Sequence, residues 1–114
     1  MKLSRIIDEF GLEVKTGGAS DTEVRGGYAS DLISDVLANA CEGDLWITLQ
    51  THQNTIAVAS MKDLAGIVLV NERQPEPDTL KKAAQENVPL LISTLGTFEL
   101  VGKLYQLGLR GTRT

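Results

Sequence analysis

The sequence predicts a single α/β domain, a mainly parallel sheet with helices on its faces. From Ser30 onward, segments with helical spacing of apolar residues alternate with short apolar runs, and short polar loops separate them. Residues 65–70 and 88–92 are apolar almost throughout, as expected for strands buried on both faces. Such alternation requires right-handed crossovers, which lead to parallel strands.

The opening of the chain carries weaker signals. Apolar residues from Leu3 to Phe10 share one face of a short helix, which Gly11 is suited to end. Residues 12–15 form a strand candidate, and a turn-rich segment over residues 16–21 follows. A second strand candidate, residues 23–27, is weakened by its glycines.

The middle of the chain alternates more clearly. Ser30 can cap a helix over residues 31–40, because a serine oxygen accepts hydrogen bonds from the first free amides. A strand over residues 45–49 and a polar loop over residues 50–54 come next. A short helix over residues 56–62 then leads to the strand at 65–70.

The last third repeats the pattern. After a loop over residues 71–77, proline and aspartate open a helix over 79–86, where an acid suits the positive helix end. The strand at 88–92 follows, and a final helix runs through Leu107 to a stop at Gly108. We therefore expect one domain over residues 1–109 and a mobile C-terminal tail over residues 110–114.

Composition excludes several function classes. Eleven Lys and Arg against 15 Asp and Glu leave a net charge of -4, which argues against nucleic acids and anionic membranes as partners. The longest apolar run, residues 64–70, is too short to span a membrane, and Asp8 and Glu9 interrupt any signal peptide. One cysteine excludes an internal disulfide framework. A cytoplasmic location is expected.

Polar residues follow the predicted strands, where open α/β sheets bind ligands. Hydroxyls, amides and free helix N–H groups suit a phosphate or carboxylate, so a nucleotide or another anion is a candidate ligand. The commoner alternative is that such residues only cap helices. The candidate residues are Ser30, Asp31, Thr51, His52, Asn54, Asn71, Ser93 and Thr94.

No pattern supports catalysis, a metal or a cofactor. His52 is the only histidine, and a lone histidine in a polar loop is usually neither an acid–base group nor a ligand. A transition-metal site would need Asp31 or Glu72, and no spacing predicts one. Cys41 is expected to be a buried, inert thiol. The chain also lacks a P-loop, a dinucleotide fingerprint and a nucleophile elbow.

Trp46 has two interpretations. Strand alternation places it with Thr48 on one face and Leu45 with Ile47 on the other. We expect Trp46 to pack against a helix; on an uncovered face it would be a dimer contact. The helix containing Ala57 could likewise pack within one subunit or against a second.

Residues 28–40 and 46–54 resemble the stand-alone DRTGG-domain proteins, particularly those whose genes accompany iron-only hydrogenases. Such chains are often described as HPr serine kinase-like, after the N-terminal domain of that kinase. The resemblance covers nearly the whole chain and implies an α/β domain of that type with a regulatory or dimer-forming role. The kinase activity belongs to a separate P-loop domain that this sequence lacks.

The sequence departs from the family pattern at the residues that name it. Gly43-Asp44 matches the family's aspartate, Leu45 stands where arginine is usual, and Asn71-Glu72 replaces the glycine pair. A site that needs close backbone approach at that pair would be altered here.

These observations predict a non-catalytic regulatory or dimerisation module that forms a homodimer. The resemblance implies a protein partner in iron-only hydrogenase or redox metabolism. The alternative is a small-molecule sensor that binds a nucleotide or anion at the C-terminal ends of the parallel strands. An enzyme that uses His52 with Asp31 or Glu72 ranks below both.

Overall fold

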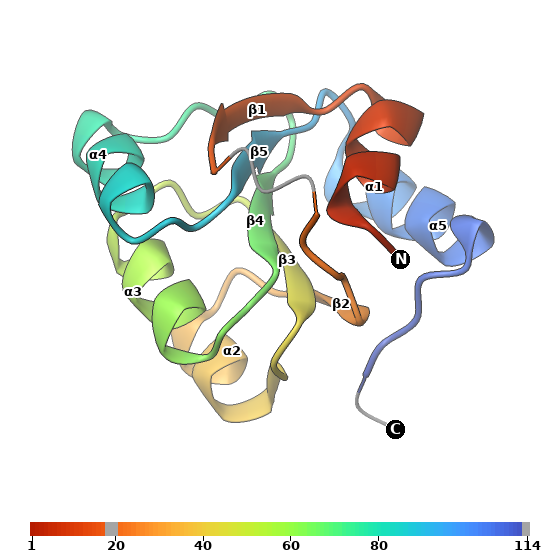
Figure 1. Cartoon of the computed structure of the whole chain (residues 1–114), viewed down its shortest axis with the longest axis horizontal. Coiled ribbons are helices and arrows are strands. Elements are labelled where there is room, and N and C mark those ends of the chain that lie inside the picture. The colour runs from red at the N-terminus through yellow and green to blue at the C-terminus, as the bar shows by residue number, and fades with distance from the viewer. Residues whose placement is uncertain (18–20, 113–114) are drawn as a thin grey trace.

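A five-stranded sheet in the order β1-β5-β4-β3-β2 runs through the part of the chain that the computed structural model describes, residues 1–17 and 21–112 (Figure 1). Strands β2 to β5 are parallel, and β1 pairs antiparallel with β5. The predicted α/β class with a mainly parallel sheet is therefore confirmed. The elements are α1 (Leu3–Phe10), β1 (Glu13–Thr16), β2 (Gly26–Ala29), α2 (Ile33–Asn39), β3 (Asp44–Thr48), α3 (Asn54–Met61), β4 (Gly66–Leu69), α4 (Pro77–Gln85), β5 (Leu90–Ile92) and α5 (Thr97–Leu107).

The direction of the chain decides which helices share a face. Each strand from β2 to β5 lies beside its predecessor, so the chain crosses the sheet in one direction. Right-handed crossovers in one direction place all connecting helices on the same side. Helices α2, α3 and α4 therefore cover one face, and the terminal helices α1 and α5 cover the other (Figure 1).

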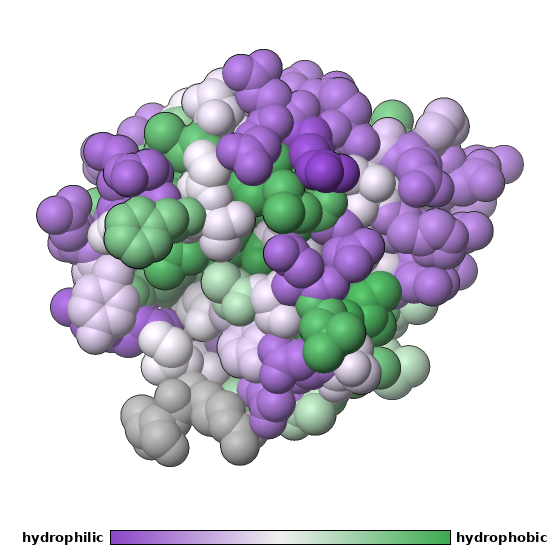
Figure 2. All heavy atoms as spheres, turned by 180° about the vertical axis from the view of Figure 1, so that it is seen from behind, coloured by the Kyte–Doolittle hydropathy of each residue, from purple (hydrophilic) through white to green (hydrophobic). Residues whose placement is uncertain are grey.

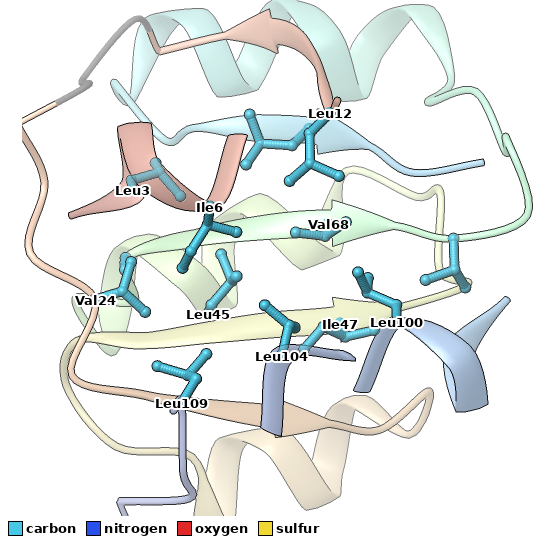
Figure 3. Packing of buried hydrophobic residues seen from close by; sticks show 13 residues of the cluster. Leu3, Ile6, Leu12, Val24, Leu45, Ile47, Val68, Leu100, Leu104 and Leu109 are labelled. Carbon is cyan, nitrogen blue, oxygen red and sulfur yellow. The ribbon is translucent and has the colours of Figure 1, made fainter. Parts of the chain in front are cut away.

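The core has two halves, one on each side of the sheet. Trp46, at the centre of β3, packs with Val36 of α2 and Ile56 of α3. Leu45 and Ile47 point to the opposite face, toward Leu104 of α5 (Figure 3). The predicted alternation along β3 is confirmed. Trp46 is fully buried, so the interpretation that it forms an exposed dimer contact is wrong.

The opening segment differs from the prediction at its second strand. The strand lies at Gly26–Ala29 instead of residues 23–27, and Glu23 makes only an isolated bridge to Lys2. The N-terminal ammonium donates a hydrogen bond to Glu23, which lowers the pKa of that carboxyl. Residues 18–20 of the expected turn lie outside the described residues.

The C-terminal segment continues along β2. The Gly27 amide donates to the Arg110 carbonyl at 3.0 Å, and the Thr112 hydroxyl donates to Asp44 at 2.8 Å. A Cβ on Gly26 would lie 2.7 Å from the Arg110 carbonyl oxygen, so only glycine admits this backbone. Residues 110–112 of the expected tail thus contact the sheet; its mobility stays a prediction, and residues 113–114 lie outside the described residues.

No helix in the described ranges has the length and apolar character needed to cross a membrane.

Candidate functional site

The parallel strands β2 to β5 end at one edge of the sheet, which we call the strand-end edge. The predicted candidate residues follow these strands or begin the next helix, so the structure brings their segments to a common edge. Their hydrogen bonds show what each does there. The residues concerned are Ser30, Asp31, Thr51, His52, Asn54, Asn71, Ser93 and Thr94.

Asp31 connects the end of β2 to the end of β3 through hydrogen bonds. Its Oδ1 accepts hydrogen bonds from the Thr48 hydroxyl at 3.0 Å and from the Leu49 amide at 2.8 Å. Its carbonyl accepts a bond from the Gln50 side-chain amide. This use of the side chain explains why α2 begins at Ile33 and not at residue 31 as predicted.

Ser30 belongs to the same connection. Its hydroxyl oxygen accepts a bond from the Leu32 amide at 3.2 Å, just before α2 begins. Its carbonyl accepts a bond from Trp46 Nε1 at 2.8 Å, which satisfies the buried indole N–H. Ser30 therefore connects the helix start with the core.

The loop after β3 is organised by its own backbone. The Thr51 carbonyl accepts a hydrogen bond from the buried Thr79 hydroxyl of α4 at 2.7 Å. His52 is exposed, and its Nδ1 accepts a bond from the Asn54 amide at 3.1 Å. The His52 carbonyl oxygen accepts a hydrogen bond from the Thr55 hydroxyl at 2.8 Å. His52 thus caps the first turn of α3.

A crevice between β4 and β5 is expected on topological grounds. The loop after β4 leads to α4 on one face, while the loop after β5 leads to α5 on the other, and such divergence opens the ligand crevice of α/β sheets. Here the Asn71 amide donates to the Leu95 carbonyl and the Glu72 amide to the Ser93 carbonyl. These two bonds join the loops directly.

The residues that make this connection have unusual backbones. Asn71 and Glu72 have φ values of 57° and 56°, in the left-handed region that costs an ordinary side chain about 1–2 kcal/mol. These are the positions where the resemblance places a glycine pair. The turn keeps a glycine-type conformation with side chains present, and those side chains are exposed.

Ser93 and Thr94 have different surroundings. Ser93 is buried, and its hydroxyl oxygen accepts a hydrogen bond from the Leu95 amide at 3.0 Å. Thr94 is exposed and lines a surface hollow of about 520 Å³ with Glu9, Lys103 and four other residues from the α1 end, the β5–α5 loop and α5. That hollow offers one acid and one base on an open surface.

The polar groups of the strand-end edge therefore hold loops in place. Across residues 1–17 and 21–112, every buried side-chain nitrogen or oxygen has a hydrogen-bond partner. The same residues contain no group of three or more His, Cys, Asp or Glu side chains able to hold a metal ion. Cys41 is half-buried, with its thiol 3.8 Å from the Asn39 carbonyl.

A second candidate site lies on the outer side of α5, next to the edge strand β2. We call it the α5–β2 face, and its residues surround an apolar hollow of about 490 Å³. Phe98 is 87% exposed and Tyr105 is 57% exposed. Figure 2 shows hydrophobic side chains at the surface on the side of α5, the left side in that view. The residues are Ala29, Thr97, Phe98, Val101, Gly102 and Tyr105.

One contact positions the aromatic side of this face. The Arg110 guanidinium lies 3.9 Å from the centre of the Tyr105 ring and donates to the Tyr105 carbonyl. A cation over an aromatic ring restrains both side chains. The spacing of Phe98, Val101 and Tyr105 was a usable sequence signal for an apolar helix face. It gave no indication that this face would be left uncovered.

Comparison with known proteins identifies a solved structure with a similar fold. No protein-family model matches the sequence, and the comparison with curated proteins finds no match. A solved structure of the CBS and DRTGG domains from the regulatory region of Clostridium perfringens pyrophosphatase, complexed with its activator diadenosine tetraphosphate, superimposes with a TM-score of 0.66. The match has 12% sequence identity and covers 89% of this chain but only 44% of the other. This chain therefore has a DRTGG-like α/β fold.

Proposed function

We propose that this chain is a non-catalytic regulatory or assembly module that works as a homodimer. The observation that supports this most is the α5–β2 face, where Phe98 and Tyr105 expose large aromatic rings. Monomeric proteins rarely keep contiguous apolar patches at the surface, and such patches mark interaction sites. A regulatory role also agrees with the structural similarity to a pyrophosphatase regulatory region.

The strand-end edge supports the non-catalytic part of the proposal. Asp31, Thr51 and Ser93 act there as acceptors within the loops. Nucleophilic catalysis needs a nucleophile within hydrogen-bond reach of a base. His52, whose Nδ1 faces the Asn54 amide, caps a helix in this arrangement.

The homodimer is tested by sedimentation velocity between 1 and 100 µM. A face of this kind predicts a reversible dimer whose fraction rises with concentration. A monodisperse monomer over the whole range would contradict the homodimer. Failure of the tagged chain to capture any protein from its native host would in addition contradict the assembly role.

The resemblance to hydrogenase-associated and HPr kinase-like DRTGG proteins supports a finer version of this function. The dimer would act in the cytoplasm on a protein partner in hydrogenase or redox metabolism. Mass spectrometry of proteins captured by the tagged chain tests this version. Recovery of redox enzymes above an untagged control is the expected result.

A second candidate function is a sensor for a nucleotide or anion at the strand-end edge. The observation that favours it is the bound diadenosine tetraphosphate in the structurally similar regulatory region. A ligand at 100 times its dissociation constant adds about 2.7 kcal/mol, which raises the melting temperature of a domain this size by about 10 °C. A thermal-shift panel of adenine and guanine nucleotides and simple anions measures this.

Two variants assign any shift to the strand-end edge. Thr51→Ala and Ser93→Ala are expected to remove the ligand-dependent shift. Ser60→Ala, near the other end of α3, is the matched control and should retain it. An unchanged melting temperature across the panel would leave the homodimeric module as the function.

A further inference from the structure

Gly102 lies in the interior of α5, where glycine is unfavourable. It is exposed, and a Cβ added there would meet no atom of residues 1–17 and 21–112 within 4 Å. Glycine in a helix interior costs about 1 kcal/mol relative to alanine. Packing among these described residues gives no reason for this cost. Glycine at this position would instead allow the surface of another molecule to approach the α5 backbone closely.

Phe98 is the counterpart of this gap on the same helix. It lies one turn before Gly102, and its ring is 87% exposed. Residues four apart on a helix are neighbours on one face. The α5–β2 face thus presents a projecting ring beside a position without a side chain.

We propose that α5 packs antiparallel against α5 of a second copy, with Phe98 of each copy seated over Gly102 of the other. This inference rests on the proposed homodimeric function and names its contact surface. A two-fold axis between the two positions makes the surface self-complementary, as isologous dimers require. A ring and a gap one turn apart match each other only when the helices run in opposite directions.

The area that the two Phe98 side chains would bury is sufficient for the centre of a dimer interface. A buried Phe side chain removes roughly 150–250 Å² from water, so the two Phe98 rings supply about a quarter of a 1,600 Å² interface. Val101 and Tyr105 border the rings, and Arg110 restrains Tyr105. The centre of such a contact is apolar, as in ordinary interfaces.

The test compares two substitutions at Gly102 by sedimentation velocity. Gly102→Gln fills the gap with a good helix former, so the dimer dissociation constant should rise at least 100-fold. The melting temperature of the diluted monomer should be equal or higher, because glutamine favours a helix. Gly102→Ala is the matched control: it gains helix propensity with little bulk and should retain the dimer within about tenfold.

The outcomes separate this inference from the function on which it rests. A wild-type dimer that Gly102→Gln leaves intact overturns the α5 contact while the homodimeric function stands. A wild-type chain that stays monomeric at 100 µM contradicts both. Loss of folding in Gly102→Gln, seen by circular dichroism, would show that Gly102 serves the interior of the subunit and would also overturn the inference.

Discussion

Trp46→Ala is expected to lower the free energy of unfolding by about 4 kcal/mol. The side chain is fully buried at the centre of β3, in the same buried cluster as Val36 and Ile56. Truncation of a buried tryptophan to alanine removes its transfer free energy and leaves a cavity, at a cost of about 3–5 kcal/mol. The substitution also removes the 2.8 Å hydrogen bond that the indole N–H donates to the Ser30 carbonyl.

Urea unfolding followed by far-ultraviolet circular dichroism measures this loss. Fluorescence is unsuitable because Trp46 is the only tryptophan in the chain. A domain holds only about 5–15 kcal/mol of stability, so the variant should be partly unfolded near 37 °C. Trp46→Phe, which keeps most of the volume, is the control and should lose less than half as much. A loss below 1 kcal/mol for the alanine variant would contradict the packing described here.

Asp31→Ala is expected to lower the free energy of unfolding by about 2 kcal/mol in the absence of any ligand. One carboxylate oxygen accepts hydrogen bonds from both the Thr48 hydroxyl and the Leu49 amide. Thr48 is fully buried, and its O–H would lose its acceptor while its oxygen keeps the hydrogen bond from the Gln50 amide at 3.1 Å. An unsatisfied buried donor costs about 1–3 kcal/mol.

Thermal and urea unfolding of the ligand-free protein measure the effect. Asp31→Asn keeps an oxygen acceptor at the same position and should lose less than half as much. This pair separates a structural role from a binding role at the strand-end edge. If Asp31 acted only on a ligand, Asp31→Ala would leave the ligand-free stability unchanged.

Hydrophobic spacing predicted the elements of the sheet well because each buries an apolar side along its own length. The strand at 65–70 and the helix after Pro77 are examples, since β4 and α4 are found there. The second strand was misplaced for a tertiary reason. Gly26 and Gly27 are poor strand residues by themselves, and their pairing with β3 is accompanied by the close backbone approach of Arg110.

The candidate residues at the strand-end edge could be located from the sequence, while their hydrogen-bond partners could not. The order of strands and polar loops was enough to predict which segments meet. The partners come from distant segments: Asp31 meets Thr48, and Thr51 meets Thr79. Local patterns do not record such contacts.

The sequence by itself determined the fold class, the two-sided burial of the central strands and the segments that share the strand-end edge. These follow from periodicities of about two and 3.6 residues, which are local properties of the chain. Only the tertiary structure decided that Trp46 is covered and Phe98 is not. Both are large apolar residues in regular elements, and their exposure depends on where the crossover direction places the helices. Helices α2, α3 and α4 cover the face that holds Trp46, whereas no helix of residues 1–17 and 21–112 covers the outer side of α5.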